Sequence, residues 1–189
     1  METPVTYLSM LRGINVSGQK LIKMTDLQRL YEALGFTGVQ TYIQSGNVVF
    51  GAHADPKEVT QHLEQGIRER FGFEVPMVIR TWNQLRATLE NNPFLSDDSV
   101  DPNRSYVAFL TNRPAPELSR KLATFSCEPD RFVIREEEIY FYCPVAYGHS
   151  KLSNNFFENQ LKVVATTRNW KTVNELAKRL QNYSAGGLS

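Results

Sequence analysis

Apolar residues recur along the chain with two spacings that alternate in a regular order. Short runs rich in β-branched and aromatic residues predict strands, whereas apolar residues three and four positions apart predict helices. In the first part of the chain, strands are predicted over 5–11, 39–44, 48–50 and 75–80. Thr25 and Asp55 are the predicted N-caps of two helices, one before the second strand and one before the fourth. This β-α-β-β-α-β order is that of a ferredoxin-like unit.

The same order returns in the second part of the chain. Its predicted strands cover 105–110, 131–134, 139–142 and 163–166, and its predicted helices cover 116–125 and 151–161. A linking helix over 82–91 and a C-terminal helix over 170–180 complete the pattern. We therefore predict an α+β fold of two ferredoxin-like (α/β-plait) domains, 1–82 and 83–189, each with an antiparallel sheet covered by helices on one face. One continuous mixed sheet is the alternative.

Composition and charge narrow the functional classes. The 189 residues are 41% hydrophobic, with 21 Lys+Arg against 20 Asp+Glu, which excludes disordered, fibrous and strongly basic proteins. The cysteines, Cys127 and Cys143, lack metal-site spacing and the histidines are scattered, so no metal site is expected. No apolar run approaches the roughly 18 residues of a membrane span, and the N-terminus does not resemble a signal peptide. We expect a cytoplasmic protein.

Two polar segments are expected at one end of the first sheet, because the first two strands of the split pattern run in the same direction. One is the loop after the first strand and the other is the turn of the hairpin; their candidate ligand-binding residues are Arg12, Asn15, Lys20, Gln44, Ser45 and Asn47. Glycines that expose backbone N–H groups, together with two cations, suit a carboxylate or phosphate. Neither a Walker loop nor a dinucleotide fingerprint is present. The alternative is that these side chains cap backbone groups in the turns.

A second polar group is predicted in the second part of the chain, at the start of its second helix and the end of its last strand. Its candidate residues are Ser150, Lys151, Thr167, Arg168 and Asn169. Two helix N-termini and two cations would favour an anion there. The alternative is ordinary N-capping by the serine, threonine or asparagine. From residue 148 onward, six basic residues stand against two acidic ones, so the near-neutral total conceals a positive C-terminal segment.

Catalytic patterns are weak, so enzymatic activity is left open. His149 is the one histidine beside a candidate site, and a surface or capping role is favoured over that of a general base. Cys143 is interpreted as a small core residue rather than a nucleophile. Tyr140, Phe141 and Tyr142 alternate across a predicted strand. On an exposed sheet they could stack nucleic-acid bases, but the RNP pattern is absent and core packing is favoured.

Several separated motifs resemble the domain-of-unknown-function 1697 family, whose members are largely bacterial. The first signature consists of Leu-Arg-Gly-Ile-Asn-Val at 11–16, Lys-Met at 23–24 and Tyr-Ile-Gln-Ser-Gly-Asn-Val-Val-Phe at 42–50. A second consists of Ser-Lys-Leu at 150–152, Ala-Thr-Thr-Arg-Asn-Trp at 165–170 and Thr-Val at 172–173. Ser17 stands where the family usually has glycine. The resemblance implies a pair of ferredoxin-like domains and brings no established activity, cofactor or catalytic residue.

These observations lead to one functional hypothesis and two alternatives. The first is an α/β protein that binds a small anionic ligand, phosphorylated or carboxylated, at the loop and helix N-terminus edges. The alternatives are a nucleic-acid-binding module and a structural or partner-binding protein without catalysis. The sequence indicates no cofactor, reaction or oligomeric state, and it does not fix whether the two edges form one cleft.

Overall fold

The computed structural model describes residues 3–185, and the chain divides into two compact units. The first unit contains Met1–Arg86 together with Leu176–Ser189, and the second contains Ala87–Glu175. The predicted domains, 1–82 and 83–189, assign the C-terminal helix to the second domain alone. In the structure, the residues of this helix from Leu176 onward belong with the first unit.

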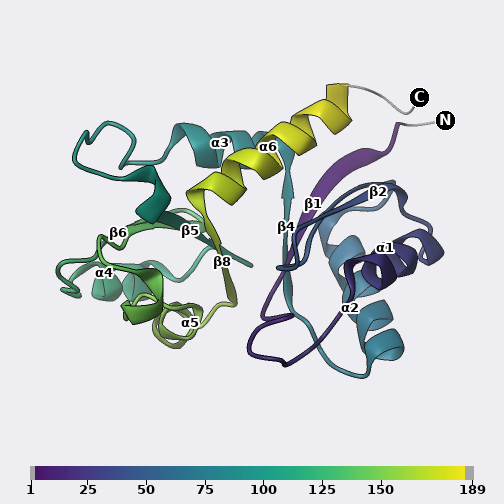
Figure 1. Cartoon of the computed structure of the whole chain (residues 1–189), viewed down its shortest axis with the longest axis horizontal. Coiled ribbons are helices and arrows are strands. Elements are labelled where there is room, and N and C mark those ends of the chain that lie inside the picture. Colours follow the sequence, from purple (N-terminus) through teal and green to yellow (C-terminus); the bar gives the residue numbers. More distant parts are fainter. Residues whose placement is uncertain (1–2, 186–189) are drawn as a thin grey trace. The chain divides into compact units, whose positions relative to one another are not determined.

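The first unit has the predicted β-α-β-β-α-β order (Figure 1). Its elements are β1 (Val5–Leu11), α1 (Met24–Ala33), β2 (Thr37–Tyr42), β3 (Asn47–Ala52), α2 (Pro56–Phe71) and β4 (Met77–Thr81). The four strands form one sheet in the order β2-β3-β1-β4, and every neighbouring pair is antiparallel. This is the split ferredoxin-like topology.

The second unit repeats the topology with an independent sheet. Its elements are β5 (Ser105–Leu110), α4 (Pro116–Ala123), β6 (Arg131–Arg135), β7 (Glu138–Tyr142), α5 (Asn154–Leu161) and β8 (Ala165–Asn169). The sheet order is β6-β7-β5-β8, again antiparallel throughout. Two short 3₁₀ turns, η1 (Pro102–Arg104) and η2 (Tyr147–His149), lie in its loops, and α3 (Trp82–Glu90) and α6 (Trp170–Ala185) are the two additional helices. The two-unit prediction is confirmed, and the single mixed sheet is wrong.

Two predicted helix starts are corrected. α1 begins at Met24 behind Lys23, which makes no side-chain cap, so Thr25 lies inside the helix rather than at its N-cap. α5 begins at Asn154 rather than Lys151. Its cap is Ser153, whose hydroxyl accepts the N–H of Phe156 at 3.2 Å. Asp55, by contrast, caps α2 as predicted by accepting two backbone N–H groups.

Each sheet buries one face against the two helices of its own unit. In the first unit, Tyr7, Phe50 and Leu63 are among the buried residues of this core. In the second unit, the corresponding core includes Ala108, Phe141 and Phe157. Burial of this much apolar surface is the main contribution to the stability of both units.

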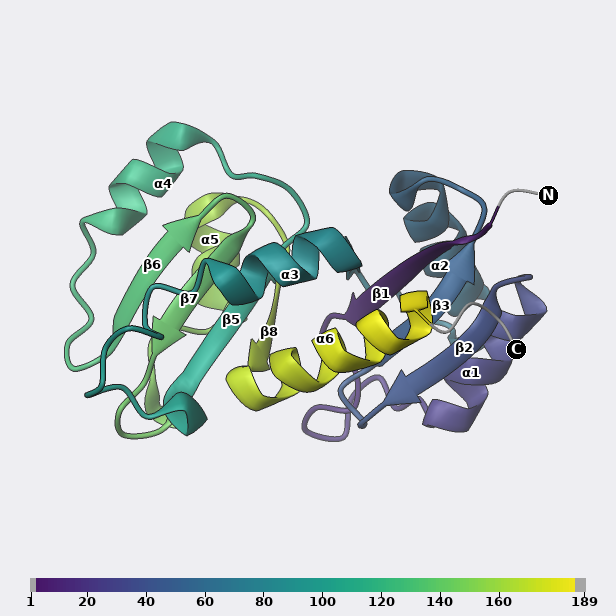
Figure 2. The same ribbon diagram turned by 90° about the horizontal axis from the view of Figure 1, so that it is seen from above.

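The opposite faces of the sheets are also covered, which the sequence did not predict. The second half of α6 lies beside β2, where the Tyr183 hydroxyl donates to the Thr37 carbonyl at 2.8 Å (Figure 2). The Arg179 guanidinium lies 4.4 Å from the centre of the Tyr42 ring. In the second unit, the hydroxyl of Tyr140 donates to the carbonyl of Thr88 in α3 at 3.0 Å. None of the helices described is long and apolar enough to cross a membrane.

Candidate functional site

The loop after β1 and the turn between β2 and β3 lie at the same end of the first sheet, as the topology predicts. The Leu11 N–H donates to the Gly46 carbonyl at 2.8 Å. The Asn15 side-chain amide donates to the Gln44 carbonyl at 2.8 Å. Gly46 has φ +73°, and a Cβ placed there would lie 2.6 Å from Ile14 Cδ1, so the contact between loop and turn requires glycine. The structure therefore brings the two predicted polar segments together.

Asn15 stabilises this contact through both the nitrogen and the oxygen of its side-chain amide. Its amide donates to the Ile22 carbonyl at 2.9 Å as well as to Gln44, and its side-chain oxygen accepts the Ile22 N–H at 2.9 Å. The backbone of Asn15 has φ +55°, a conformation that asparagine tolerates better than most residues. Asn15 is thus a structural residue of the loop.

The polar residues of the hairpin turn also form hydrogen bonds within the protein. Asn47 is buried, and its amide donates to the Tyr42 carbonyl at 3.1 Å and to the Ser45 hydroxyl at 2.9 Å. The side chain of Gln44 is exposed, while its carbonyl receives the bond from Asn15. For Asn15, Ser45 and Asn47, the capping alternative describes the contacts in the structure.

Two residues of the loop form hydrogen bonds with the segment that leads into β4, Lys20 through its side chain and Arg12 through its backbone. The Lys20 ammonium donates to the Glu74 carbonyl at 2.6 Å. The Arg12 N–H donates to the Pro76 carbonyl at 2.8 Å, and the Arg12 side chain is half-buried. These bonds hold the loop against residues 74–76.

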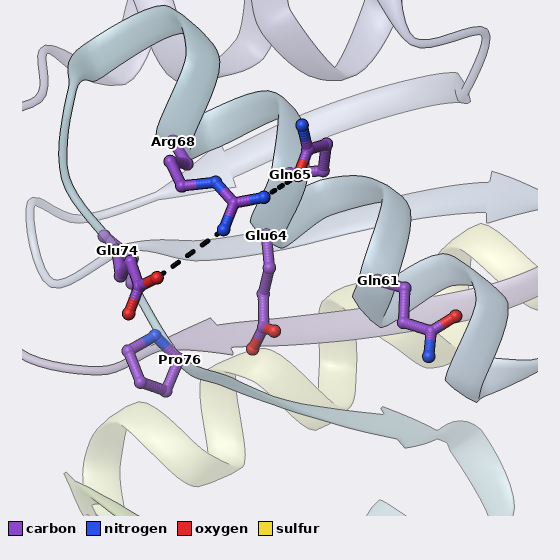
Figure 3. Close-up of a pocket in the computed structure, with 7 residues that line it drawn as sticks. Gln61, Glu64, Gln65, Arg68, Glu74 and Pro76 are labelled. Carbon is purple, nitrogen blue, oxygen red and sulfur yellow. Dashed lines mark hydrogen bonds and ion pairs between the residues drawn. The ribbon is translucent and has the colours of Figure 1, made fainter.

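A pocket of about 330 Å³ lies between α2 and this same segment (Figure 3). Arg68 forms an ion pair with Glu74 at 3.6 Å and donates a hydrogen bond to Gln65. Figure 3 shows Glu64 extending from α2 toward Pro76. Partial burial raises the pKa of Glu64, the nearby Glu74 raises it further, and a hydrogen bond from the backbone of Met77 lowers it in part. Arg68, the cation that lines this pocket, is already paired with Glu74, which makes the pocket unsuited to an anion.

Glu64→Gln is expected to raise the melting temperature at neutral pH. The pKa of Glu64 is higher in the folded than in the unfolded protein, so its charged form is disfavoured by folding. At pH values above both pKa values, this charge lowers the stability of the folded protein. The gain should shrink as the pH falls and vanish below about 4.3, the ordinary glutamate value. Melting curves of both proteins between neutral and acidic pH measure it. Glu69→Gln, at an exposed position of α2, is the control, and a gain independent of pH would contradict the prediction.

The polar residues predicted to form a second anion site do not all lie together in the structure. The Thr167 hydroxyl donates to Asn154 Oδ1 at 2.7 Å, which places the middle of β8 beside the first residue of α5. Asn169 caps α6, because its side-chain oxygen accepts the Thr172 N–H at 2.8 Å. Asn169 is therefore engaged in the capping role that was the alternative to ligand binding.

Arg168 lies on the other face of the sheet from the α4–α5 layer. Successive strand residues point to opposite faces, and Arg168 pairs with Val107 rather than with the core residue Ala108. It is buried and donates to the Thr166 hydroxyl at 2.8 Å and to the Thr167 carbonyl at 2.9 Å. Burial lowers its pKa to about 10. The side chains of Arg168 and Thr167 therefore lie on opposite faces of the sheet, although the Arg168 guanidinium bonds to the Thr167 backbone.

A second pocket, of about 380 Å³, is formed within the second unit by residues 126–130, 145–146 and 149–151. Ser150 and Lys151 line it, and the other polar or titratable side chains of its lining include His149, Cys127, Glu128 and Asp130. The Ser150 hydroxyl donates to Asp130 Oδ2 at 2.6 Å and accepts the backbone N–H of Leu152 at 2.9 Å. Sequence reasoning missed Asp130, because the turn that carries it has no recognisable motif.

Neither the Cys127 thiol, which lines this pocket, nor the Cys143 thiol, which contacts Ser150, is activated. Burial raises the pKa of Cys143 to about 11, partly offset by its hydrogen bond with Ser150. Burial also raises the pKa of Cys127, whose thiol donates to the Asp130 carbonyl at 3.3 Å. A thiol that stays protonated at neutral pH is a poor nucleophile. Within residues 3–185, no group of three or more His, Cys, Asp or Glu side chains is arranged to hold a metal ion.

The aromatic residues considered for nucleic-acid stacking are not on an open surface. Tyr140 and Phe141 are buried, the first against α3 and the second in the core of the second unit. Tyr142 is half-buried, and the Arg131 guanidinium lies 5.3 Å from its ring centre. The core packing favoured from the sequence is confirmed for Tyr140 and Phe141.

Comparison with known proteins agrees with the sequence motifs and the topology. The family model described as "Protein of unknown function (DUF1697)" matches residues 5–140. Among curated proteins, none matches this chain. A solved structure, that of the conserved bacterial protein SP0830 from Streptococcus pneumoniae, is similar with a TM-score of 0.77 and 21% identity, over 94% of this chain and 99% of that one. That likeness supports the two-unit fold. The extent of the family match shows that the chain belongs to the DUF1697 family of proteins of unknown function.

Proposed function

We propose that the protein binds a small anionic ligand in the pocket of the second unit. The observation that carries the proposal is the convergence of Lys151, His149 and the Ser150–Asp130 hydrogen bond on one cavity of about 380 Å³. A cavity of this size holds a small metabolite. Lys151 is exposed, so its ammonium can contact a phosphate or carboxylate that enters the pocket.

The acidic side of the pocket narrows the ligand class. Asp130 already accepts the Ser150 hydroxyl at 2.6 Å, which shows that its carboxylate receives hydroxyl donors in this geometry. The ligand that suits both sides is an anion that also carries hydroxyl groups, with the charged group at Lys151 and a hydroxyl at Asp130. A reducing, cytoplasmic location is part of the same proposal and is supported by the free thiols Cys127 and Cys143.

Thermal shift with glycerol 3-phosphate tests the proposal, with inorganic phosphate and glycerol in parallel. We expect glycerol 3-phosphate to raise the melting temperature more than phosphate and glycerol to have no effect, because bound ligand stabilises the folded state by mass action. Lys151→Ala should abolish the shift, and Lys171→Ala, an exposed lysine in the same unit, should retain it. Absence of any shift with hydroxylated phosphates and carboxylates, or an equal loss in both variants, would refute the proposal.

A further inference from the structure

An open groove of about 820 Å³ runs along the edge strand β6 of the second unit. Four consecutive residues of this strand, 132–135, line one side, and Ser119, Arg120 and Ala123 of α4 line the other. Successive side chains of a strand point to opposite faces, so a groove lined by four consecutive residues follows the edge of the backbone rather than one face of the sheet.

The edge of β6 has no neighbouring strand on the side of this groove. The sheet order is β6-β7-β5-β8, and within residues 3–185 β6 pairs with β7 alone. The outer edge of such a strand presents backbone N–H and C=O groups that can pair with another extended chain. Phe132, Val133 and Ile134 are half-buried, so the strand also offers apolar surface.

The groove carries an excess of positive charge. Arg113, Arg120 and Arg135 line it, against the single carboxylate of Glu136. Arg113 is paired with Glu136 at 2.7 Å, whereas Arg135 donates to the Asn91 carbonyl at 2.7 Å and lies opposite Glu138 in the β6–β7 ladder. The Arg120 side chain is exposed. A ligand with carboxylates complements this lining.

The sequence of β6 argues against a second copy of the same strand as the occupant. The strand begins with Arg131 and ends with Arg135. In an antiparallel pair of two β6 strands in full register, Arg131 of each copy would lie opposite Arg135 of the other, and like charges directly opposite destabilise a ladder. A segment with carboxylates at the corresponding positions would gain from the same geometry.

We infer that this groove binds an extended acidic peptide of a partner protein, which adds to the sheet as a strand beside β6. The backbone edge supplies ladder hydrogen bonds, the half-buried residues of β6 contact apolar side chains of the peptide, and the arginines pair with its carboxylates. The site is separate from the anion pocket, whose lining residues are a different set.

Fluorescence anisotropy of the full chain with a labelled peptide of alternating glutamate and valine tests the inference. We expect saturable binding that Arg120→Glu weakens roughly tenfold or more, since it places a like charge beside the peptide. Lys121→Glu makes the same charge change at the next, exposed position of α4, which does not line the groove, and should leave binding within about twofold of the unmodified chain. A peptide N-methylated at the residues that face β6 keeps its charge and should not bind, because its ladder donors are removed.

Four outcomes would overturn the inference. They are no saturable binding, equal losses in the two charge variants, undiminished binding of the N-methylated peptide, and displacement of the peptide by an unstructured oligothymidylate at equal concentration, which would indicate a nucleic-acid surface. Sedimentation gives an independent check: a dimer of the free chain that Arg120→Glu dissociates would assign the groove to a second copy instead.

Discussion

Asn15→Ala is expected to lower the free energy of unfolding by about 2–4 kcal/mol, because the side chain of Asn15 holds the loop in place. The substitution removes three hydrogen bonds and leaves both backbone groups of the buried Ile22 without these partners. It also places alanine at φ +55°, where a Cβ is disfavoured and the asparagine side chain no longer compensates.

Urea unfolding followed by circular dichroism measures this change, and Gln44→Ala is the matched control. Gln44 contributes only its backbone carbonyl to the contact, so removal of its exposed side chain should leave stability within about 0.5 kcal/mol of the unmodified chain. A loss below about 1 kcal/mol for Asn15→Ala would show that the loop does not depend on this side chain. That result would favour a ligand-binding role for Asn15.

Phe50→Ala is expected to cost about 3–5 kcal/mol, the range for deleting a large aromatic side chain from a core. Phe50 is fully buried on β3, and its ring centre lies 4.9 Å from that of Phe36, 5.2 Å from that of Tyr31 and 6.0 Å from that of Tyr7. The substitution therefore opens a cavity among three rings and removes their edge and tilted contacts with the fourth.

Phe50→Leu distinguishes cavity formation from a general effect of substitution at this position. Leucine fills part of the space, so we expect it to cost well under half as much as alanine in the same urea titration. Equal losses for the two variants would mean that packing volume does not determine the stability of this core.

The order of elements was predictable because each strand and helix carries its own apolar spacing, and both units repeat the same sequence of spacings. The starts of α1 and α5 were predicted wrongly for a local reason. Thr25 with Gln28 forms a capping pattern one residue inside the helix, and Ser150 competes with Ser153 as a cap, so side-chain chemistry alone selects the wrong residue. The covering of the second face of each sheet was not predicted, because contacts such as that of Tyr183 with Thr37 join residues far apart in the sequence.

For the candidate site, the topology predicted which polar segments lie close together but not which groups each side chain contacts. The loop after β1 and the hairpin turn meet as expected, yet Asn15 and Asn47 direct their amides at backbone carbonyls. Arg168 follows Thr167 in sequence, but strand alternation puts it on the other face, where it is buried. Lys151 does line a cavity, but Asp130, which lines the same cavity, comes twenty-one positions earlier in the sequence, so local sequence does not join the two.

The assignment of α6 to both units has a consequence for how the protein is made. Synthesis proceeds from the N-terminus, and domains usually fold as they emerge from the ribosome. Here the residues that lie beside β2, including Arg179 and Tyr183, are synthesised after the whole of the second unit. All of Ala87–Glu175 is therefore translated before the first unit has its final helix, so the unit that begins first is completed last.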